Sequence, residues 1–207
     1  MPIEVNNLVK HFTNTSFKIE GIYHYVVEPG QSGCLETAPF AGFIFPLGGQ
    51  AEFDFNGTTY MAGPQNVIHG GARMNLRKRV VGNTKWEYIL VLYNEGKTSR
   101  KEMVLADTHF ELVTGQSARL TDLLRRLWRL SSQPGAIPAF QTETMFRCVL
   151  EEIFVCARNL TNDGAQALFE QVSAYIHEYY MDSLTVRRLA VECPPIFVPV
   201  EELVLIC

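Results

Sequence analysis

The chain has 207 residues, which is enough for one domain with a large buried core or for one domain and a small appendage. Its apolar content of 47% and charged content of 19% are typical of a globular protein and exclude a disordered one. A net charge of -4 argues against a chain that grips DNA by itself, because phosphate binding requires a surplus of Lys and Arg. We find no secretory signal, no apolar run of about 18 residues and no paired cysteine spacing. These features predict a cytoplasmic protein without a membrane partner.

From Phe17 to about Asn94 the sequence predicts a series of short strands. Apolar, β-branched and aromatic residues alternate there with polar ones, and glycine and proline separate the runs. The clearest signal is Asn56-Gly57 between AEFDF and TTYMA, because both central positions of a type I′ turn require a positive φ. Regularly spaced strands of this kind indicate a sandwich or barrel.

After residue 116 the apolar period becomes helical. A first helix follows Ser117, a plausible N-cap, with one stripe of apolar residues and several arginines elsewhere on its surface. The proline-containing segment SSQPGAIPAF (131–140) is expected to end it, giving a ten-residue loop. A second helix is expected over 142–160, a break at Thr-Asn-Asp-Gly (161–164), a third helix from 165 to 181 and a fourth from Leu184. The two helices flanking the ten-residue loop are expected to form an antiparallel pair.

The segment GGQAEFDFNGTTYMAGPQNVIHGG (48–71) resembles the small cupin-like sensor barrel of bacterial AraC-type transcription regulators. The helical pair resembles the dimerisation helices of that family. YIHEYYMDSLTVRRLA (175–190) resembles the opening of its DNA-binding domain, an entry helix followed by the first helix of a helix-turn-helix. The resemblance implies an α+β chain: a jelly-roll (double-stranded β-helix) barrel, an antiparallel helical pair and a truncated helical tail. The expected divisions are 1–110 for effector binding, 111–162 for dimerisation and 163–207 for the incomplete helix-turn-helix.

The sequence departs from the family after Ala190, where a proline-rich stretch stands in place of the recognition helix that enters the major groove. The resemblance places Arg187 and Arg188 on the first helix of the motif, where they would contact only the DNA backbone. We therefore expect that this chain does not read DNA bases, and that DNA contact requires a complete C-terminal domain.

A metal-dependent cupin enzyme is an alternative, because such enzymes use the same barrel. Their metal needs three or four converging His or carboxylate ligands. Only His24 and His69 are candidates here, and strands 33–50 contain no histidine. We expect no metal, no other cofactor and no catalytic activity. A stand-alone small-molecule binding module is a further alternative.

Several residues are candidates for contacting a small-molecule effector. Strand alternation places Trp86 and Tyr88 on one face with Leu90 and Leu92, either as core or as a platform for an amphipathic ligand such as a sugar. His69 either bonds the backbone at a strand end or contacts the effector, and Arg73 is either solvated or paired with an anionic effector. The cluster from Arg77 to Arg79 is expected to be a solvated sheet edge. The candidates are His24, Phe43, Phe45, Tyr60, His69, Arg73, Trp86 and Tyr88.

The helical pair carries more apolar surface than one small barrel is expected to cover. This surplus predicts a homodimer through those helices. The residues expected in the dimer interface are Leu120, Leu124, Leu127, Phe146, Val149 and Ile153.

Overall fold

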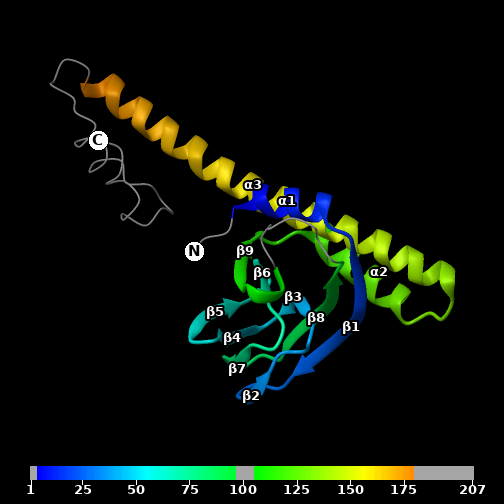
Figure 1. The fold of residues 1–207 in the computed structure, drawn as a ribbon. Coiled ribbons are helices and arrows are strands. Elements are labelled where there is room, and N and C mark those ends of the chain that lie inside the picture. The colour runs from blue at the N-terminus through cyan, green and yellow to red at the C-terminus, as the bar shows by residue number, and fades with distance from the viewer. Residues whose placement is uncertain (1–3, 97–104, 180–207) are drawn as a thin grey trace. The chain divides into compact units, whose positions relative to one another are not determined.

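The computed structural model describes residues 4–96 and 105–179 of the chain (Figure 1). The helices are α1 (Val5–Asn14), α2 (Ala118–Ser131) and α3 (Ala136–Tyr179), with a short 3-10 helix η1 (Leu105–Asp107). The strands are β1 (Phe17–Val27), β2 (Ser32–Glu36), β3 (Ala41–Gly48), β4 (Gln50–Phe55), β5 (Thr58–Ala62), β6 (Asn66–Gly70), β7 (Asn75–Val81), β8 (Trp86–Glu95) and β9 (Phe110–Val113). The chain divides into two compact units, 1–157 and 158–207. The residue boundary expected at 110 falls inside the first unit.

The strands pair as one long hairpin folded back on itself. β4 pairs with β5, β3 with β6, β2 with β7 and β1 with β8, all antiparallel, so that the pairs nest around the β4–β5 turn. Within the described residues this winding gives a sheet of order β1-β8-β3-β6-β9 facing a sheet of order β2-β7-β4-β5 (Figure 1). That arrangement is a jelly roll. It confirms the predicted α+β class and cupin-like barrel.

The β4–β5 turn is the predicted hairpin. Asn56 and Gly57 have φ values of 50° and 95°, the left-handed conformation that a two-residue type I′ turn needs. The Gly57 amide donates to the Asp54 carboxylate at 3.0 Å, which fastens the turn to the preceding strand. Local sequence alone therefore determines the point around which the barrel winds.

The five-stranded sheet is apolar on both faces, and strand alternation sends neighbouring residues to different cores. Ile44, Trp86 and Tyr88 belong to a cluster inside the barrel with Phe53 and Phe55 of the opposite sheet. The intervening residues of β3 and β8 belong to a second cluster on the outer face, beneath the helices. The outer cluster includes Phe43, Phe45, Ile89, Val91 and Tyr93.

Helix α1 was not indicated by the sequence analysis, although Leu8, His11 and Phe12 have helical spacing and are buried. The Phe12 ring lies 5.8 Å from that of Tyr93 and 6.0 Å from that of Phe154. A hydrogen bond of 2.7 Å joins His11 Nε2 to Glu95 Oε1 at the end of β8. The helix thus closes one part of the outer core.

The helical pair follows the prediction at its start and differs at its turn. Ser117 is the N-cap of α2, and its hydroxyl accepts the Leu120 amide hydrogen at 3.1 Å. The expected ten-residue loop is wrong, because α3 begins at Ala136 and contains Pro138 in its first turn. Proline is tolerated there because amides of the first turn have no helical acceptor. The expected break at 161–164 is also wrong, since α3 continues through it; Asn, Asp and Gly weaken a helix, but none blocks its backbone bonds as proline does.

The structure corrects the residues assigned to the dimer interface. All six are at most 7% exposed within the single chain and belong to the outer core beneath the helices: Leu120, Leu124, Leu127, Phe146, Val149 and Ile153. The Phe146 ring, for example, lies 5.6 Å from that of Phe17 and 6.2 Å from that of Phe43. These stripes cover the sheet, so a partner chain cannot contact them in the folded monomer.

The segment after Tyr179 lies outside the described residues, and with it the expected helix from Leu184, Arg187 and Arg188. No helix in the described part of the chain is long and apolar enough to cross a membrane.

Candidate functional site

The interior of the barrel is lined by stacked aromatic rings from both sheets. The Trp86 and Tyr88 rings lie 3.9 Å apart, and Tyr88 stacks at 5.0 Å on Tyr25 of β1. Phe53 of the opposite sheet lies 5.1 Å from Trp86. The expected common face of Trp86 and Tyr88 with Leu90 is the inner face of β8.

The rings of Tyr25, Phe53 and Tyr88 border a cavity of about 190 Å³ inside the barrel. Its walls are mainly apolar and come from strands of both sheets; they include Tyr25, Ile44, Phe53, Phe55, Tyr88 and Leu90. A dry apolar cavity of about 150 Å³ is large enough for benzene. The interior therefore has room for a molecule with one aromatic ring and a small substituent.

Lys78 is the charged side chain that lines this cavity. It lies on β7 between Leu76 and Val80, which both belong to the inner cluster, and strand alternation places it on the same face. Directly opposite on β2 is Gly33, which has no side chain to fill the space beside Lys78. Among the described residues no carboxylate pairs with the Lys78 ammonium group.

A second hollow, of about 440 Å³, is bordered by apolar side chains and by polar or charged ones: Val27, Ala51, Val80 and Trp86, with Gln31, Ser32, Lys78 and Arg79. Trp86 is 1% exposed, and its indole Nε1 is buried without an acceptor in the part of the chain that the structure describes. A buried donor of this kind costs stability unless something accepts its hydrogen. Lys78 lines both spaces, so the cation and the unpaired indole border the same 440 Å³ hollow.

Burial raises the pKa of the Tyr88 hydroxyl above its ordinary value, and the neighbouring Tyr25 raises it further. Tyr88 therefore remains a neutral phenol at any physiological pH and offers a hydrogen-bond donor, not a negative charge. Within the cavity wall, Lys78 is the group that carries charge.

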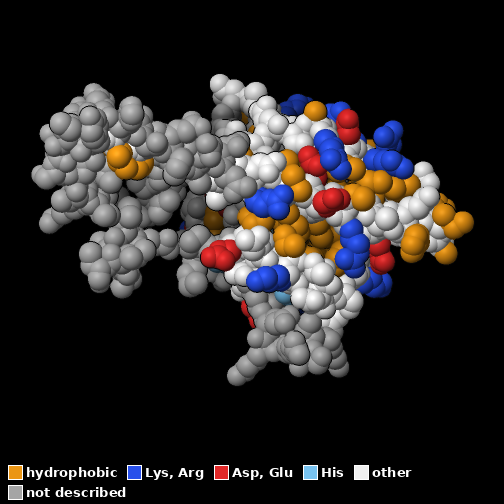
Figure 2. Space-filling model, turned by 90° about the horizontal axis from the view of Figure 1, so that it is seen from above, with side chains coloured by type: hydrophobic (Ala, Val, Ile, Leu, Met, Phe, Trp, Pro, Cys, Tyr) orange, Lys and Arg blue, Asp and Glu red, His pale blue; other side chains and the backbone are white. Residues whose placement is uncertain are grey.

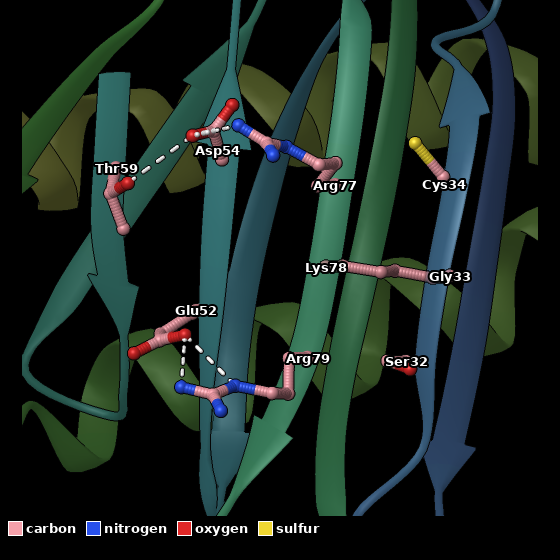
Figure 3. Close-up of a pocket in the computed structure, with 9 residues that line it drawn as sticks. All are labelled: Ser32, Gly33, Cys34, Glu52, Asp54, Thr59, Arg77, Lys78 and Arg79. Atoms are coloured by element: carbon pink, nitrogen blue, oxygen red, sulfur yellow. Dashed lines mark hydrogen bonds and ion pairs between the residues drawn. The ribbon is translucent and has the colours of Figure 1, made fainter. Parts of the chain in front are cut away.

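A third hollow, of about 520 Å³, lies on the outer face of the four-stranded sheet (Figure 3). Figure 3 shows Arg77 directed towards Asp54 and Arg79 towards Glu52, at 3.2 Å and 2.7 Å. These exposed pairs neutralise one another, and Lys78, which also borders this hollow, has no carboxylate partner among the described residues. The segment Arg77–Arg79 was expected to be a sheet edge, and this is wrong, because β7 pairs on one side with β2 and on the other with β4.

Three of the expected effector contacts face away from the cavity. Phe43, Phe45 and His69 lie on the outer face of the five-stranded sheet, beneath the helices. His69 is fully buried, donates to or accepts from the Tyr93 hydroxyl at 2.9 Å, and stacks on Phe110. Burial lowers the pKa of His69 to about 3, so this histidine is a neutral core residue.

The other expected contacts are distributed around the barrel. His24 is on the outer face, 2.8 Å from Glu87 and beside the ring of Trp128 on α2. The Tyr60 hydroxyl bonds His109 Nδ1 at 2.8 Å, and its ring packs against the inner cluster without lining either space. Arg73 is exposed in the turn before β7, where its φ is 52°. Trp86 and Tyr88 are thus the two expected contacts that border the interior spaces.

The described residues contain no group of three or more His, Cys, Asp or Glu side chains placed to hold a metal ion. His24 and His69, the two candidate ligands, both lie on the outer face of their sheet.

The sequence analysis missed Lys78, although a signal was present. In NLRKRVV the residues Leu76, Lys78 and Val80 alternate with outward-facing arginines. A lysine between two apolar residues at a spacing of two indicates an inward cation once the segment is assigned to a strand. The arginines on either side of Lys78 led to the interpretation of this segment as a solvated sheet edge.

No family model matches the sequence, and no curated protein matches it. Three of the similar solved structures are a ToxT variant from Vibrio cholerae, a Cupin 2 conserved barrel protein from Salinispora arenicola and the Cnp3 cupin domain from Schizosaccharomyces pombe. ToxT is 9% identical, with 86% of this chain and 70% of that chain covered, at a TM-score of 0.44. The Salinispora protein is 14% identical over 39% and 76%, and Cnp3 is 15% identical over 39% and 59%, both at a TM-score of 0.33. Scores this low carry no argument about function, and the assignment of the fold rests on the strand order.

Proposed function

We propose that this chain is the ligand-sensing and dimerising region of an AraC-type transcription regulator, and that a small-molecule effector binds inside its barrel. The observation that supports this role is the interior cavity, bordered by stacked aromatic rings and by Lys78, a cation without a partner in the described residues. A concave apolar space with a few polar groups is the usual form of a small-molecule site. The role implies binding without catalysis, in the cytoplasm.

The test is a thermal-shift screen of the full chain against small metabolites. An effector that binds only the folded state raises the unfolding temperature, by a free energy of RT ln(1 + [L]/Kd). Hits are repeated on Tyr88→Leu, which removes the central ring of the stack, and on Tyr23→Leu, whose side chain is 44% exposed and does not line the cavity. We expect the first variant to lose the shift and the second to keep it. An equal loss in both would contradict binding inside the barrel.

We also propose that the chain forms a homodimer through the exposed side of the helical pair. Ile137 and Phe140, one turn apart at the start of α3, are each 72% exposed, which is unusual for large apolar side chains. Figure 2, which views the helices from above, shows apolar side chains gathered towards the turn that joins α2 and α3. We expect Phe140→Asp to be monomeric in analytical ultracentrifugation at tens of micromolar, where the wild type is dimeric. A monomeric wild type would refute the dimer.

The alternative function is a metal-dependent cupin enzyme. Metal analysis of the purified chain separates the two proposals, because stoichiometric Fe, Mn, Zn or Ni lost on substitution of His24 or His69 would favour the enzyme.

We also propose that DNA is not read by this chain alone. A gel-shift selection from random duplexes at low salt should enrich no sequence.

A further inference from the structure

We infer that the effector is a small aromatic monocarboxylate, bound with its carboxylate at Lys78 and its ring against the aromatic stack. This inference rests on the proposed sensing function and concerns the same site. Its basis is the pair of unmatched polar groups inside the barrel, Lys78 and the Trp86 indole, together with the size and character of the walls.

An inward lysine is an unusual feature of a jelly-roll core. Lys78 is half-buried between Leu76 and Val80, and the described residues supply no anion for it. A partly desolvated cation without a counter-ion makes the empty barrel less stable than an apolar side chain would. A ligand that brings a negative charge into the barrel removes that cost when it binds.

The second unmatched group is the Trp86 Nε1 hydrogen. Trp86 is almost completely buried and borders the hollow that Lys78 also borders. One cation and one neutral donor match a carboxylate, whose single charge is divided between two acceptor oxygens. A phosphate monoester would bring a second negative charge, and the second cation that borders this hollow, Arg79, already pairs with Glu52 at 2.7 Å, so a carboxylate fits better.

The walls of the 190 Å³ cavity indicate a flat apolar body. Tyr25, Tyr88 and Phe53 present ring surfaces, on which another ring can stack. A sugar would require several free polar partners. The polar side chains of this wall are Lys78, the two tyrosines and Thr37, and Thr37 Oγ1 already donates to the Gly71 carbonyl and accepts from the Met74 amide, both at 2.8 Å.

The sequence permits a direct test by fluorescence, because it contains two tryptophans. In a Trp128→Phe background Trp86 is the single tryptophan, and phenylacetate and the neutral phenylacetamide serve as matched probes. We expect phenylacetate to change Trp86 emission saturably and phenylacetamide to bind more weakly. Lys78→Met in the same background keeps the length of the side chain and removes its charge. It should weaken phenylacetate binding by roughly ten- to hundredfold and leave phenylacetamide binding unchanged.

The control is Lys85→Met, which removes an exposed lysine paired with Glu28 and should change neither affinity. Unfolding of the ligand-free variants gives a second readout. Lys78→Met should unfold at the same temperature as its parent or higher, whereas a structural lysine would lose stability when replaced. Equal affinity for phenylacetate and phenylacetamide, or unchanged phenylacetate binding by Lys78→Met, would overturn the inference. If the metabolite screen then yields only neutral ligands that depend on Tyr88, the proposed sensing function stands without it.

Discussion

The burial of Ile153 provides a test of whether the helical stripes form the core of one chain or the contact between two. Ile153 is 0% exposed in the single chain and lies in the cluster beneath the helices. Ile153→Ala removes three buried carbon groups, which cost about 2.4 kcal/mol at about 0.8 kcal/mol each. The cavity left behind raises the expected loss in the free energy of unfolding to about 3–4 kcal/mol.

The measurement is urea unfolding, followed by circular dichroism, at two protein concentrations. With a urea dependence of about 2 kcal/mol/M, the midpoint should fall by about 1.5–2 M. Because the contacts are intramolecular, the loss should be the same at both concentrations, whereas the loss of an interface contact would vary with concentration. Val155→Ala on the same helix is the matched control; its side chain is 39% exposed and lies outside the proposed dimer surface, and we expect a loss of less than about 1 kcal/mol.

The reasoning would be refuted if Ile153→Ala kept the wild-type urea midpoint and changed only the sedimentation coefficient. In that case the stripe would be an interface after all, as the amphipathic pattern alone had suggested.

Two further predictions follow from backbone geometry and burial. Gly57→Ala should lower the free energy of unfolding by about 1 kcal/mol, because φ at this position is 95°. Gly48→Ala, where the space is similarly open but φ is not positive, should lower it less. Equal losses of the two variants in urea unfolding would contradict the turn assignment. The pKa of His69 falls to about 3 on folding, against 6.5 for an ordinary histidine, so the unfolded chain binds a proton more readily than the folded chain. The free energy of unfolding therefore decreases as the pH drops below 6.5, by up to about 1.4 kcal/mol per pH unit. The double variant His69→Phe/Tyr93→Phe, which leaves no unpaired hydroxyl, should show a shallower loss between pH 6.5 and 4, and an unchanged slope would count against a neutral buried His69.

Local sequence determined much of the secondary structure. The turn at Asn56-Gly57, the N-cap at Ser117 and the common face of Trp86 and Tyr88 all depend on residues within a few positions of one another. Such features follow from φ preferences, from a side-chain acceptor at a helix start and from the period of a strand. The helix interruption expected at 131–140 is present but shorter, because proline is tolerated in a first turn. The interruption expected at 161–164 was wrong, because a few weak helix formers do not prevent a helix from forming.

Which face of each strand met the cavity was decided only by the tertiary structure. Both faces of β3 and β8 are apolar, because one covers the barrel interior and the other the helices, so alternation could not tell Phe43 from Ile44. The same ambiguity applied to the stripes of α2 and α3, whose partner was a sheet of the same chain. Lys78 could be recognised as a candidate site residue only when β7 was placed between β2 and β4. This placement shows that its side chain lies among apolar groups, with no carboxylate beside it in the described residues. The period of apolar residues predicts that one face of a helix or strand is buried, and only the tertiary structure shows which element covers that face.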